Sequence, residues 1–254
     1  MIMITILSCI LFLVPFGSCV TKWPTVLVLG DNFVESCFSN KSPWCALLAH
    51  NLTRIADVEN RGAIDYDTAS YFSELKPALQ ETDRNNVGLV ILFIGIQDSY
   101  GETGIYQHFA LDFFAEDLTN LIKGINASIP SKRILLILGP PGLTFQAAYR
   151  TDKTAGLFND RAIQVANDNF VKFLDLRNQM KKDFQTAPKW EKNFIPYHSG
   201  VKFNEDGAYY FFNYIRQHVH IKLKEFLHTA YLNKKFPDMP EFEYPEPPEP
   251  EDKN

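Results

Sequence analysis

The stretch Val26-Leu27-Val28-Leu29-Gly30-Asp31-Asn32-Phe33 decides how the rest of the sequence is interpreted. Its four leading apolar residues, two of them β-branched, predict a short buried strand, and Gly30 and Asp31 end it as turn residues do. In an open parallel α/β sheet, ligands and catalytic groups gather at the carboxyl ends of the strands. Asn32 leaves the strand at that edge and therefore occupies a position of functional interest.

Apolar runs alternate with segments of helical periodicity along the chain. Strands are predicted around residues 57–59, 87–94, 134–138 and 171–174, and helices at 43–48, 68–79, 109–125 and 156–168. A last helix is predicted to start after residues 204–207 and to run to about residue 227. The unbroken apolar run 87–94 is typical of a strand covered on both faces of its sheet. This alternation predicts one parallel sheet with right-handed crossovers. Residues 36–42 are interpreted as a loop, and the aromatic run 209–212 as the core face of the last helix.

Length, composition and charge restrict the class of protein. A chain of 254 residues, 46% of them hydrophobic, can build the core of one large α/β domain or of two small ones, and we assign a single domain to residues 23–235. A net charge of −5 without dense runs of Lys or Arg argues against a nucleic-acid partner. Residues 236–254 are rich in proline and acids and predict a disordered tail. No pattern indicates a cofactor.

Residues 1–19 have the pattern of a secretory signal peptide. The nearly continuous apolar run from Ile2 to Phe16 has the length of a signal h-region and is short for a membrane span, and small residues around Cys19 follow it. We therefore expect a protein that is secreted or in the lumen of the secretory pathway, with no membrane span after cleavage. No basic residue precedes the apolar run, and an uncleaved anchor is the alternative.

A secretory route bears on the cysteines and on three asparagines. Cys37 and Cys45 are the cysteines certain to remain after cleavage, and in an oxidising compartment we expect them to pair across a short loop. Two buried free thiols are the alternative. The Asn-x-Ser/Thr triplets at Asn40, Asn51 and Asn126 are candidate N-glycosylation sites, although such triplets also occur by chance.

Four stretches near predicted strand ends carry a family resemblance. They are Leu29-Gly30-Asp31-Asn32, Asn60-Arg61-Gly62-Ala63-Ile64-Asp65-Tyr66-Asp67-Thr68, Gly95-Ile96-Gln97-Asp98-Ser99 and Ser199-Gly200-Val201-Lys202-Phe203-Asn204-Glu205-Asp206-Gly207. Their order and spacing, with Trp23-Pro24 before the first strand and Trp44 after it, resemble the sequence blocks of SGNH, or GDSL-type, ester hydrolases. Within that family they look most like the isoamyl acetate-hydrolysing esterase branch. The resemblance runs from about residue 23 to 227 and implies a three-layer α/β/α sandwich with a flavodoxin-like parallel sheet of about five strands.

The catalytic positions that this resemblance implies are all occupied by other residue types. Asn32 stands at the position of the serine nucleophile, and Asp65 at that of a glycine whose backbone N–H helps to bind the oxyanion. Gln97 stands at the position of an asparagine that donates to the oxyanion. The Asp-x-x-His pair of the family, a base with its orienting carboxylate, falls on Ser199 and Lys202.

These replacements oppose acyl transfer, which needs a nucleophile, a base and donors to the developing oxyanion. Asn32 has no ionisable hydroxyl, and Lys202 is protonated near neutral pH and is a poor base. Asp65 would place a carboxylate where negative charge must develop, so Gln97 alone can still donate a hydrogen bond. We therefore interpret the chain as a pseudoenzyme with a binding or interaction role. Its ligand is an unidentified small ester-like molecule or a protein partner.

Two other functions stay open. An active carboxylic ester hydrolase would need relocated catalytic residues, with His198 and either Ser36 or Ser99 as candidates, although no such pair falls at positions that the fold would bring together.

The second is a metal-dependent hydrolase that uses Asp31, Asp65 and Asp98. Lys202 would lie among these carboxylates and no histidine joins them at ligand spacing, which makes solvated or paired carboxylates the favoured interpretation.

The changes at Asp65 and Lys202 also predict a contact. A lone carboxylate in a partly buried cleft is costly, and so is a lone ammonium. We expect the Lys202 ammonium within about 4 Å of the Asp65 carboxylate, with Asn32 or Gln97 hydrogen-bonding nearby. The alternative is that Lys202 points to solvent.

Overall fold

One parallel five-stranded sheet forms the centre of the protein. The computed structural model describes residues 23–100, 105–142, 150–194 and 202–232, so the expected signal peptide and acidic tail lie outside the described residues. The strands are β1 (Thr25–Gly30), β2 (Asp57–Gly62), β3 (Val87–Phe93), β4 (Ile134–Leu138) and β5 (Lys172–Asp175). Their order is β2-β1-β3-β4-β5 and all pairs are parallel. The predicted flavodoxin-like sheet is confirmed.

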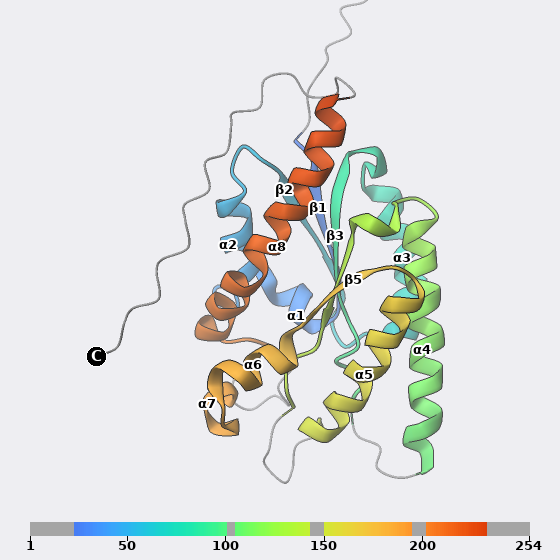
Figure 1. Cartoon of the computed structure of the whole chain (residues 1–254), viewed down its shortest axis with the longest axis vertical. Coiled ribbons are helices and arrows are strands. Elements are labelled where there is room, and N and C mark those ends of the chain that lie inside the picture. The colour runs from blue at the N-terminus through green and yellow to red at the C-terminus, as the bar shows by residue number, and fades with distance from the viewer. Residues whose placement is uncertain (1–22, 101–104, 143–149, 195–201, 233–254) are drawn as a thin grey trace, which may run out of the picture.

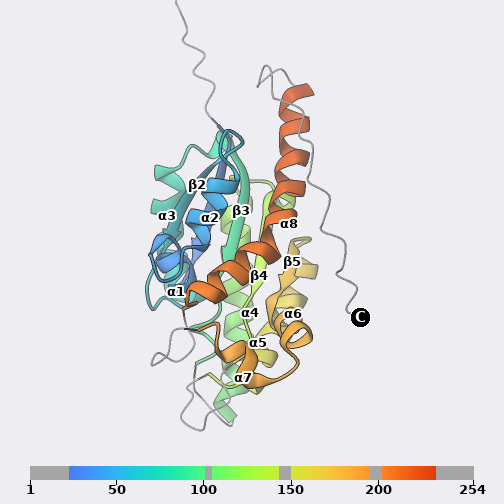
Figure 2. The same cartoon turned by 90° about the vertical axis from the view of Figure 1, so that its left-hand side faces the viewer.

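Helices cover both faces of this sheet and complete three layers. The helices are α1 (Asn32–Glu35), α2 (Trp44–Asn51), α3 (Thr68–Glu81), α4 (Ile105–Asn126), α5 (Asp152–Asp168), α6 (Leu176–Phe184), α7 (Ala187–Glu191) and α8 (Glu205–Leu232). Figure 1 shows α2 and α8 on one side of the sheet, and α3, α4 and α5 on the other. In Figure 2, which faces the first of these layers, α8 crosses the sheet. The sequence did not predict α1, α6 and α7, because helices of nine residues or fewer are too short to give a clear helical pattern.

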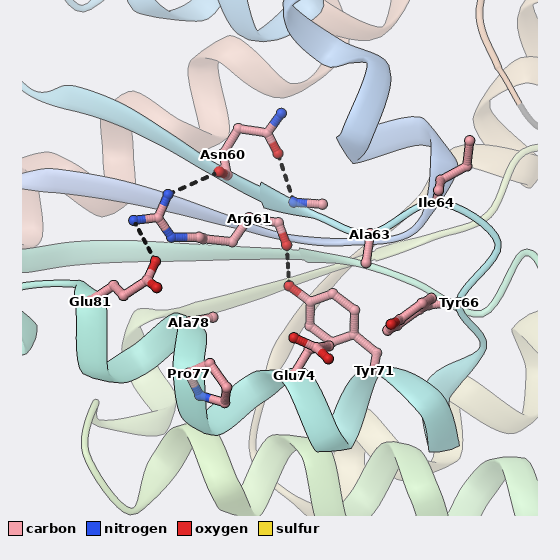
Figure 3. A pocket seen from close by; sticks show the side chains of 11 residues that line it. Asn60, Arg61, Ala63, Ile64, Tyr66, Tyr71, Glu74, Pro77, Ala78 and Glu81 are labelled. Atoms are coloured by element: carbon pink, nitrogen blue, oxygen red, sulfur yellow. Dashed lines mark hydrogen bonds and ion pairs between the residues drawn. The ribbon is translucent and has the colours of Figure 1, made fainter.

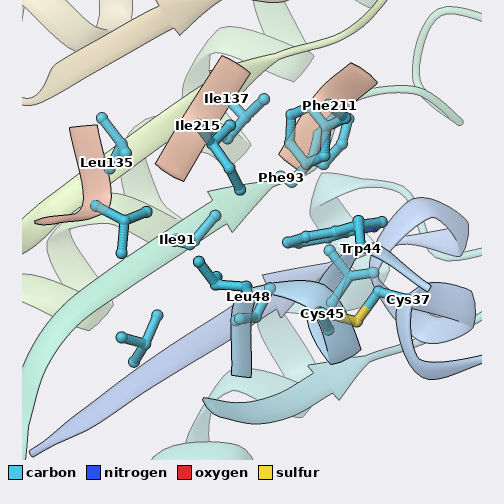
Figure 4. Packing of buried hydrophobic residues seen from close by; sticks show 14 of the residues in the cluster. Cys37, Trp44, Cys45, Leu48, Ile91, Phe93, Leu135, Ile137, Phe211 and Ile215 are labelled. Carbon is cyan, nitrogen blue, oxygen red and sulfur yellow. A yellow bond between two sulfur atoms is a disulfide. The ribbon is translucent and has the colours of Figure 1, made fainter. Parts of the chain in front are cut away.

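Strand β3 lies in the middle of the sheet, and all seven of its residues are buried. Side chains of alternate residues point to opposite faces. Ile91 and Phe93 join the apolar cluster under α2 and α8, whereas Val90 and Leu92 join the cluster under α3, α4 and α5. Figure 4 shows the first cluster, in which Phe211 of α8 packs against Phe93. Burial on both faces therefore explains the unbroken apolar run.

The aromatic run 209–212 does not form the core face of α8 as predicted. Only Phe211 is fully buried, while Tyr210 and Phe212 pack partly against the core and Tyr209 is 47% exposed. The reason is geometric, since four consecutive helical residues point in directions spread around most of the helix axis. The buried face of α8 follows the helical period instead and continues from Phe211 to Ile215 and Val219.

The connection between α1 and α2 is held by a disulfide and a side-chain hydrogen bond. Cys37 is bonded to Cys45, and their Cα atoms lie 5.0 Å apart, so the predicted disulfide is present (Figure 4). Cys37 belongs to a 3-10 turn, Ser36–Phe38, within the segment predicted as a loop. Next to Cys45, the Trp44 indole N–H donates to the carbonyl of Phe33 at 2.9 Å. These contacts fix the short helix that begins at the end of β1.

Removal of this disulfide is expected to destabilise the protein. In the double variant Cys37→Ser/Cys45→Ser, the denatured chain regains the freedom of a short loop, which lowers the free energy of unfolding by about 2–3 kcal/mol. Urea denaturation of the two proteins measures this difference. The matching chemical test is peptide mapping without reductant, and recovery of Cys37 and Cys45 as free thiols in the secreted protein would contradict the pairing.

Candidate functional site

Three of the four sequence blocks meet at the carboxyl ends of β1, β2 and β3, near the lower end of the sheet in Figure 1. The strands end level with one another, because Gly30 pairs with Gly62 on one side and with Phe93 on the other. A Cβ atom at Gly30 would lie 1.9 Å from the Phe93 carbonyl oxygen, and the backbone there has φ +154°. Only glycine allows so close an approach of the two strands.

Asp31 connects the segments that follow β1 and β3. Its carboxylate is fully buried and accepts hydrogen bonds from the backbone N–H groups of Phe33 and Ile96, both at 3.2 Å. The backbone N–H of Asp31 donates to Phe93 at 3.3 Å. Burial raises the pKa of Asp31 to about 7, because the loss of hydration outweighs these hydrogen bonds. Asp31 therefore has a structural role at the edge where the candidate site lies.

Asn32, Asp65 and Gln97 form one hydrogen-bonded cluster. The Asn32 side-chain N–H donates to Asp65 Oδ1 at 2.9 Å, and the backbone N–H of Asp65 donates back to Asn32 Oδ1. Gln97 Nε2 donates to the same Asp65 oxygen at 3.1 Å. Asn32 is only 4% exposed, so this reciprocal pairing provides both ends of its buried amide with partners. The expected hydrogen bonds beside Asp65 are thus confirmed, and both candidate donors make them.

The backbone at Asp65 is unusual for a residue with a side chain. Its φ is +59°, in the left-handed region that favours glycine, although Asp is among the residues that adopt it most readily. The resemblance placed a family glycine at this position. The fold therefore keeps the glycine-type backbone while the side chain of Asp65 reaches Asn32 and Gln97.

The predicted ion pair between Lys202 and Asp65 is wrong. The Lys202 ammonium lies 3.4 Å from Glu35 Oε2, at the end of α1. The prediction assumed a partly buried carboxylate, but Asp65 is exposed, so water and the two amide groups that donate to Asp65 Oδ1 solvate it without a cation. Both members of the Lys202–Glu35 pair are partly exposed, so it contributes little to stability. Ser199 and His198 lie outside the described residues.

The two serines considered as relocated nucleophiles are held by other groups. Ser36 Oγ donates to the Asn32 carbonyl at 2.8 Å. Ser99 Oγ donates to the Ile96 carbonyl at 2.7 Å and accepts from Arg150 Nε at 2.6 Å. Within the described ranges neither serine contacts a histidine, so neither is activated there by a Ser/His pair.

Arg150 is a buried cation of this region that the sequence did not indicate. It is 2% exposed, and its Nη2 donates to the Pro140 carbonyl at 2.7 Å while Nε bonds to Ser99. Burial lowers its pKa to about 10, which leaves it protonated at neutral pH. Arg150 thus joins the segment after β4 to the segment after β3. A single arginine beside a turn carries no periodic signal of its burial.

Asp98 binds the start of α3. Its Oδ1 accepts from the Thr68 hydroxyl at 2.6 Å, and its two oxygens accept from the Thr68 backbone N–H at 3.2 and 3.1 Å. Burial raises the pKa of Asp98 to about 6. Within the part of the chain that the structure describes, no three His, Cys, Asp or Glu side chains come together as metal ligands. Asp31, Asp65 and Asp98 are each engaged by protein donors instead.

The three candidate glycosylation sites are all exposed. Asn40 follows the 3-10 turn, Asn51 ends α2 and Asn126 ends α4. Asn51 Oδ1 lies 2.7 Å from His220 Nε2, which leaves the nitrogen of that amide available. In the described ranges, no helix has the length and apolar character needed to span a bilayer.

Comparisons with known proteins agree with this architecture. A sequence model of the GDSL-like Lipase/Acylhydrolase family matches residues 28–208. The isoamyl acetate-hydrolyzing esterase 1 homolog of Rattus norvegicus is 31% identical over 182 residues, which cover 64% of this chain and 70% of that protein. Its Mus musculus counterpart is 30% identical over 179 residues, with the same coverage.

Solved structures show the same fold at much lower sequence identity. A lipase/acylhydrolase from Enterococcus faecalis has a TM-score of 0.61 at 16% identity, and the match covers 77% of this chain and 95% of that one. The acetyl xylan esterase AlAXEase also has a TM-score of 0.61 at 16% identity, covering 77% of this chain and 99% of that one. These likenesses establish the three-layer fold of SGNH hydrolases.

The raised pKa of Asp98 predicts how stability depends on pH. Because the pKa in the folded state is about 6 and the ordinary value is 3.8, the protonated form is favoured by folding. Asp98 therefore contributes its full stabilisation to the folded protein below pH 3.8, the pKa in the unfolded chain, and this contribution disappears as pH rises through about 6. The variant Asp98→Asn keeps an acceptor for Thr68 and removes the titration, so it should flatten the decline in unfolding free energy between pH 4 and 6.

The expected difference is at most about 3 kcal/mol, measured by urea denaturation at several pH values. Asp31 continues the decline towards pH 7, since its pKa is about 7. The variant Asp57→Asn, at an exposed position at the start of β2, provides the control. An Asp98→Asn protein with the same pH slope as the parent would show that Asp98 does not titrate in this range.

Proposed function

The chain belongs to the GDSL-like Lipase/Acylhydrolase family, and we propose that it is a secreted member without ester hydrolase activity, which uses the fold to bind a ligand or partner. The observation that carries this proposal is the reciprocal pairing of Asn32 with Asp65. Asn32 lies at the position of the family nucleophile, and both ends of its amide are bound to the neighbouring block. The two residues that replace the family's serine and glycine therefore hold each other in place by hydrogen bonds.

The electrostatics of this cluster also support a non-catalytic role. In an acyl-transfer site, donors must face the place where the oxyanion develops. Here the two side-chain amides that face the loop, Asn32 and Gln97, both donate to the Asp65 carboxylate. A carboxylate at that position opposes an oxyanion, and the donors that would stabilise the transition state are already used.

A secretory location is supported by chemistry of the folded domain. Disulfides persist in oxidising compartments, and the Cys37–Cys45 bond connects two buried segments. The exposed positions of Asn40, Asn51 and Asn126 would allow glycans to be attached without disturbing the core. Together with the apolar run in residues 1–19, these features fit a glycosylated secreted protein.

The competing function is an active carboxylic ester hydrolase with relocated residues. What favours it is the similarity, at 30–31% identity, to proteins named as isoamyl acetate-hydrolyzing esterase homologs. Such an enzyme would need a serine and a base that lie together. The partners of Ser36 and Ser99 are backbone carbonyls and Arg150, which weakens this alternative.

The two functions predict opposite results with a serine-directed probe. We expect the purified mature protein to remain unlabelled by a fluorophosphonate and to leave short-chain p-nitrophenyl esters intact, because Asn32 has no ionisable hydroxyl. Mass spectrometry after incubation with the probe measures labelling, with an active SGNH esterase treated in parallel. Stoichiometric labelling that persists in Asn32→Ala and maps to another serine would refute the proposal.

Restoration of the nucleophile alone is expected to give no appreciable esterase. In Asn32→Ser the new hydroxyl lacks a base, and the members of a catalytic triad act as a unit. The matched comparison is the combined variant Asn32→Ser, Asp65→Gly, Gln97→Asn, Ser199→Asp and Lys202→His, which supplies every family residue. Initial rates on p-nitrophenyl acetate compare the two, and fast turnover by the single variant would mean that a base is already present.

A further inference from the structure

The outer edge of β2 has no partner strand in the described part of the chain. This strand stands at one end of the sheet and pairs with β1 alone. The backbone N–H groups of Asp57 and Ala63 both donate towards β1, at 2.8 and 2.9 Å. Because backbone groups alternate in direction along a strand, the odd-numbered residues face β1, and those of Val58, Asn60 and Gly62 point outwards.

Side chains of the strand itself satisfy only part of this outward-facing backbone. The Asn60 amide oxygen accepts from the Gly62 N–H at 2.8 Å, and Arg61 Nη1 donates to the Asn60 carbonyl at 3.4 Å (Figure 3). The N–H and C=O of Val58 and the N–H of Asn60 have no partner among the described residues. Open donors and acceptors on an edge strand are a template for a further strand.

A concave surface runs beside this edge, between β2 and α3. It has a volume of about 470 Å³ and is lined by residues 60–64 on one side and by Glu74, Pro77, Ala78 and Glu81 of α3 on the other. The α3 residues recur at helical spacing and form one stripe that follows the strand, as Figure 3 shows. The surface therefore leaves room beside β2 for the side chains of an added strand.

The side chains that β2 turns towards α3 are a carboxylate and a guanidinium two residues apart. Glu59 accepts from the Thr82 hydroxyl at 3.0 Å, and Arg61 Nη2 lies 3.6 Å from Glu81 Oε2, so both belong to this face. Glu59 and Arg61 also contact each other. Arg61 Nε is shielded from solvent and has no acceptor within the described ranges. Such a buried donor indicates that one copy of the chain leaves the guanidinium an acceptor short.

Together, the backbone directions and these charges favour one way of pairing two copies of the chain. A two-fold axis brings the same edge of each copy together with antiparallel strands. Outward-facing residues must then lie opposite one another. If Asn60 faced Val58 of the second copy, Glu59 would face Glu59. If Asn60 faced Gly62, Arg61 would face Arg61, and like charges directly opposite are destabilising in both cases. With Asn60 opposite Asn60, each Glu59 faces an Arg61.

We propose that the outer edge of β2 binds a second copy of this chain, in antiparallel register centred on Asn60, so that the two five-stranded sheets become one continuous sheet. Asn60 bonds to its counterpart, and the Gly62 N–H exchanges the Asn60 side chain for the Val58 carbonyl. Glu59 and Arg61 of different copies meet in a pair without backbone hydrogen bonds, where side chains approach closest. This carboxylate provides the acceptor that Arg61 Nε lacks.

The proposal does not depend on whether the protein is an esterase, because the paired segment contains no catalytic position of the family. Sedimentation equilibrium of the mature protein over a concentration series tests it, and we expect a reversible monomer–dimer equilibrium. In Glu59→Arg and in Arg61→Glu, each cross-strand pair carries like charges, so the dimer dissociation constant should rise at least about tenfold. Lys172→Glu reverses an exposed charge on β5, the opposite edge strand, and is the matched control that should dimerise like the parent.

An equimolar mixture of the two charge variants separates this register from an effect within each chain. Positions 59 and 61 are both positive in Glu59→Arg and both negative in Arg61→Glu, so each cross-strand pair of the mixed dimer has opposite charges. We expect the mixture to dimerise at least as tightly as the parent, while each variant alone dimerises weakly. Circular dichroism verifies that both variants are folded.

Hydrogen exchange provides a second measurement, on the unaltered protein. The backbone amides of Val58 and Asn60 should exchange more slowly as the protein concentration rises, while those of β5 stay unchanged. The proposal is overturned if the parent stays monomeric throughout the series, since a different molecule or water would then occupy the edge. It is also overturned if both charge variants dimerise like the parent, or if the mixture of folded variants stays monomeric. Where a variant does not fold, exchange at Val58 and Asn60 that is independent of concentration overturns it.

Discussion

The buried carboxylate of Asp31 holds the functional edge of the sheet together. It accepts N–H groups from the segments that follow β1 and β3, and its own backbone N–H binds the last residue of β3. A charged group without water is costly, as the raised pKa of Asp31 indicates, and the structure tolerates it because the same atoms satisfy backbone donors that would otherwise be buried without partners. The positions of Asn32 and Gln97 both follow from this constraint.

At this edge of the sheet, Asn32, Asp65 and Gln97 stand at catalytic positions of the family and bind one another. Asp65 adopts a backbone conformation that disfavours most side chains, and two amides donate to its carboxylate. The buried amide of Asn32 would lack partners without Asp65, whereas Asp65 is exposed and reaches both amides from the surface. The need of the buried Asn32 amide for partners explains how the three types of residue coexist at one edge. It also explains why a change at one of them alone is a poor test of the site.

Charges at this end of the molecule are distributed over separate local partnerships. Lys202 pairs with Glu35, Asp98 binds the start of α3, and Arg150 connects the segments after β3 and β4. The partners in each contact are close in space although they are far apart in sequence. The site is therefore stabilised by many local contacts that do not require a central metal or ion pair.

Much of the fold was accessible from the sequence, because the unbroken apolar run 87–94 indicates a buried strand and helices such as 68–79 carry their burial pattern in local periodicity. The blocks that contain Asn32, Asp65 and Gln97 also predicted which side chains would meet, since parallel strands place their carboxyl ends at one edge. Local patterns do not encode the partner of a particular charge. The packing of segments distant in sequence brings Lys202 to Glu35 and not to Asp65. The same kind of packing buries Arg150. The sequence by itself thus determined the layers and the composition of the candidate site, and only the tertiary structure decided the pairing within it, because hydrogen bonds and ion pairs require contact within a few ångströms.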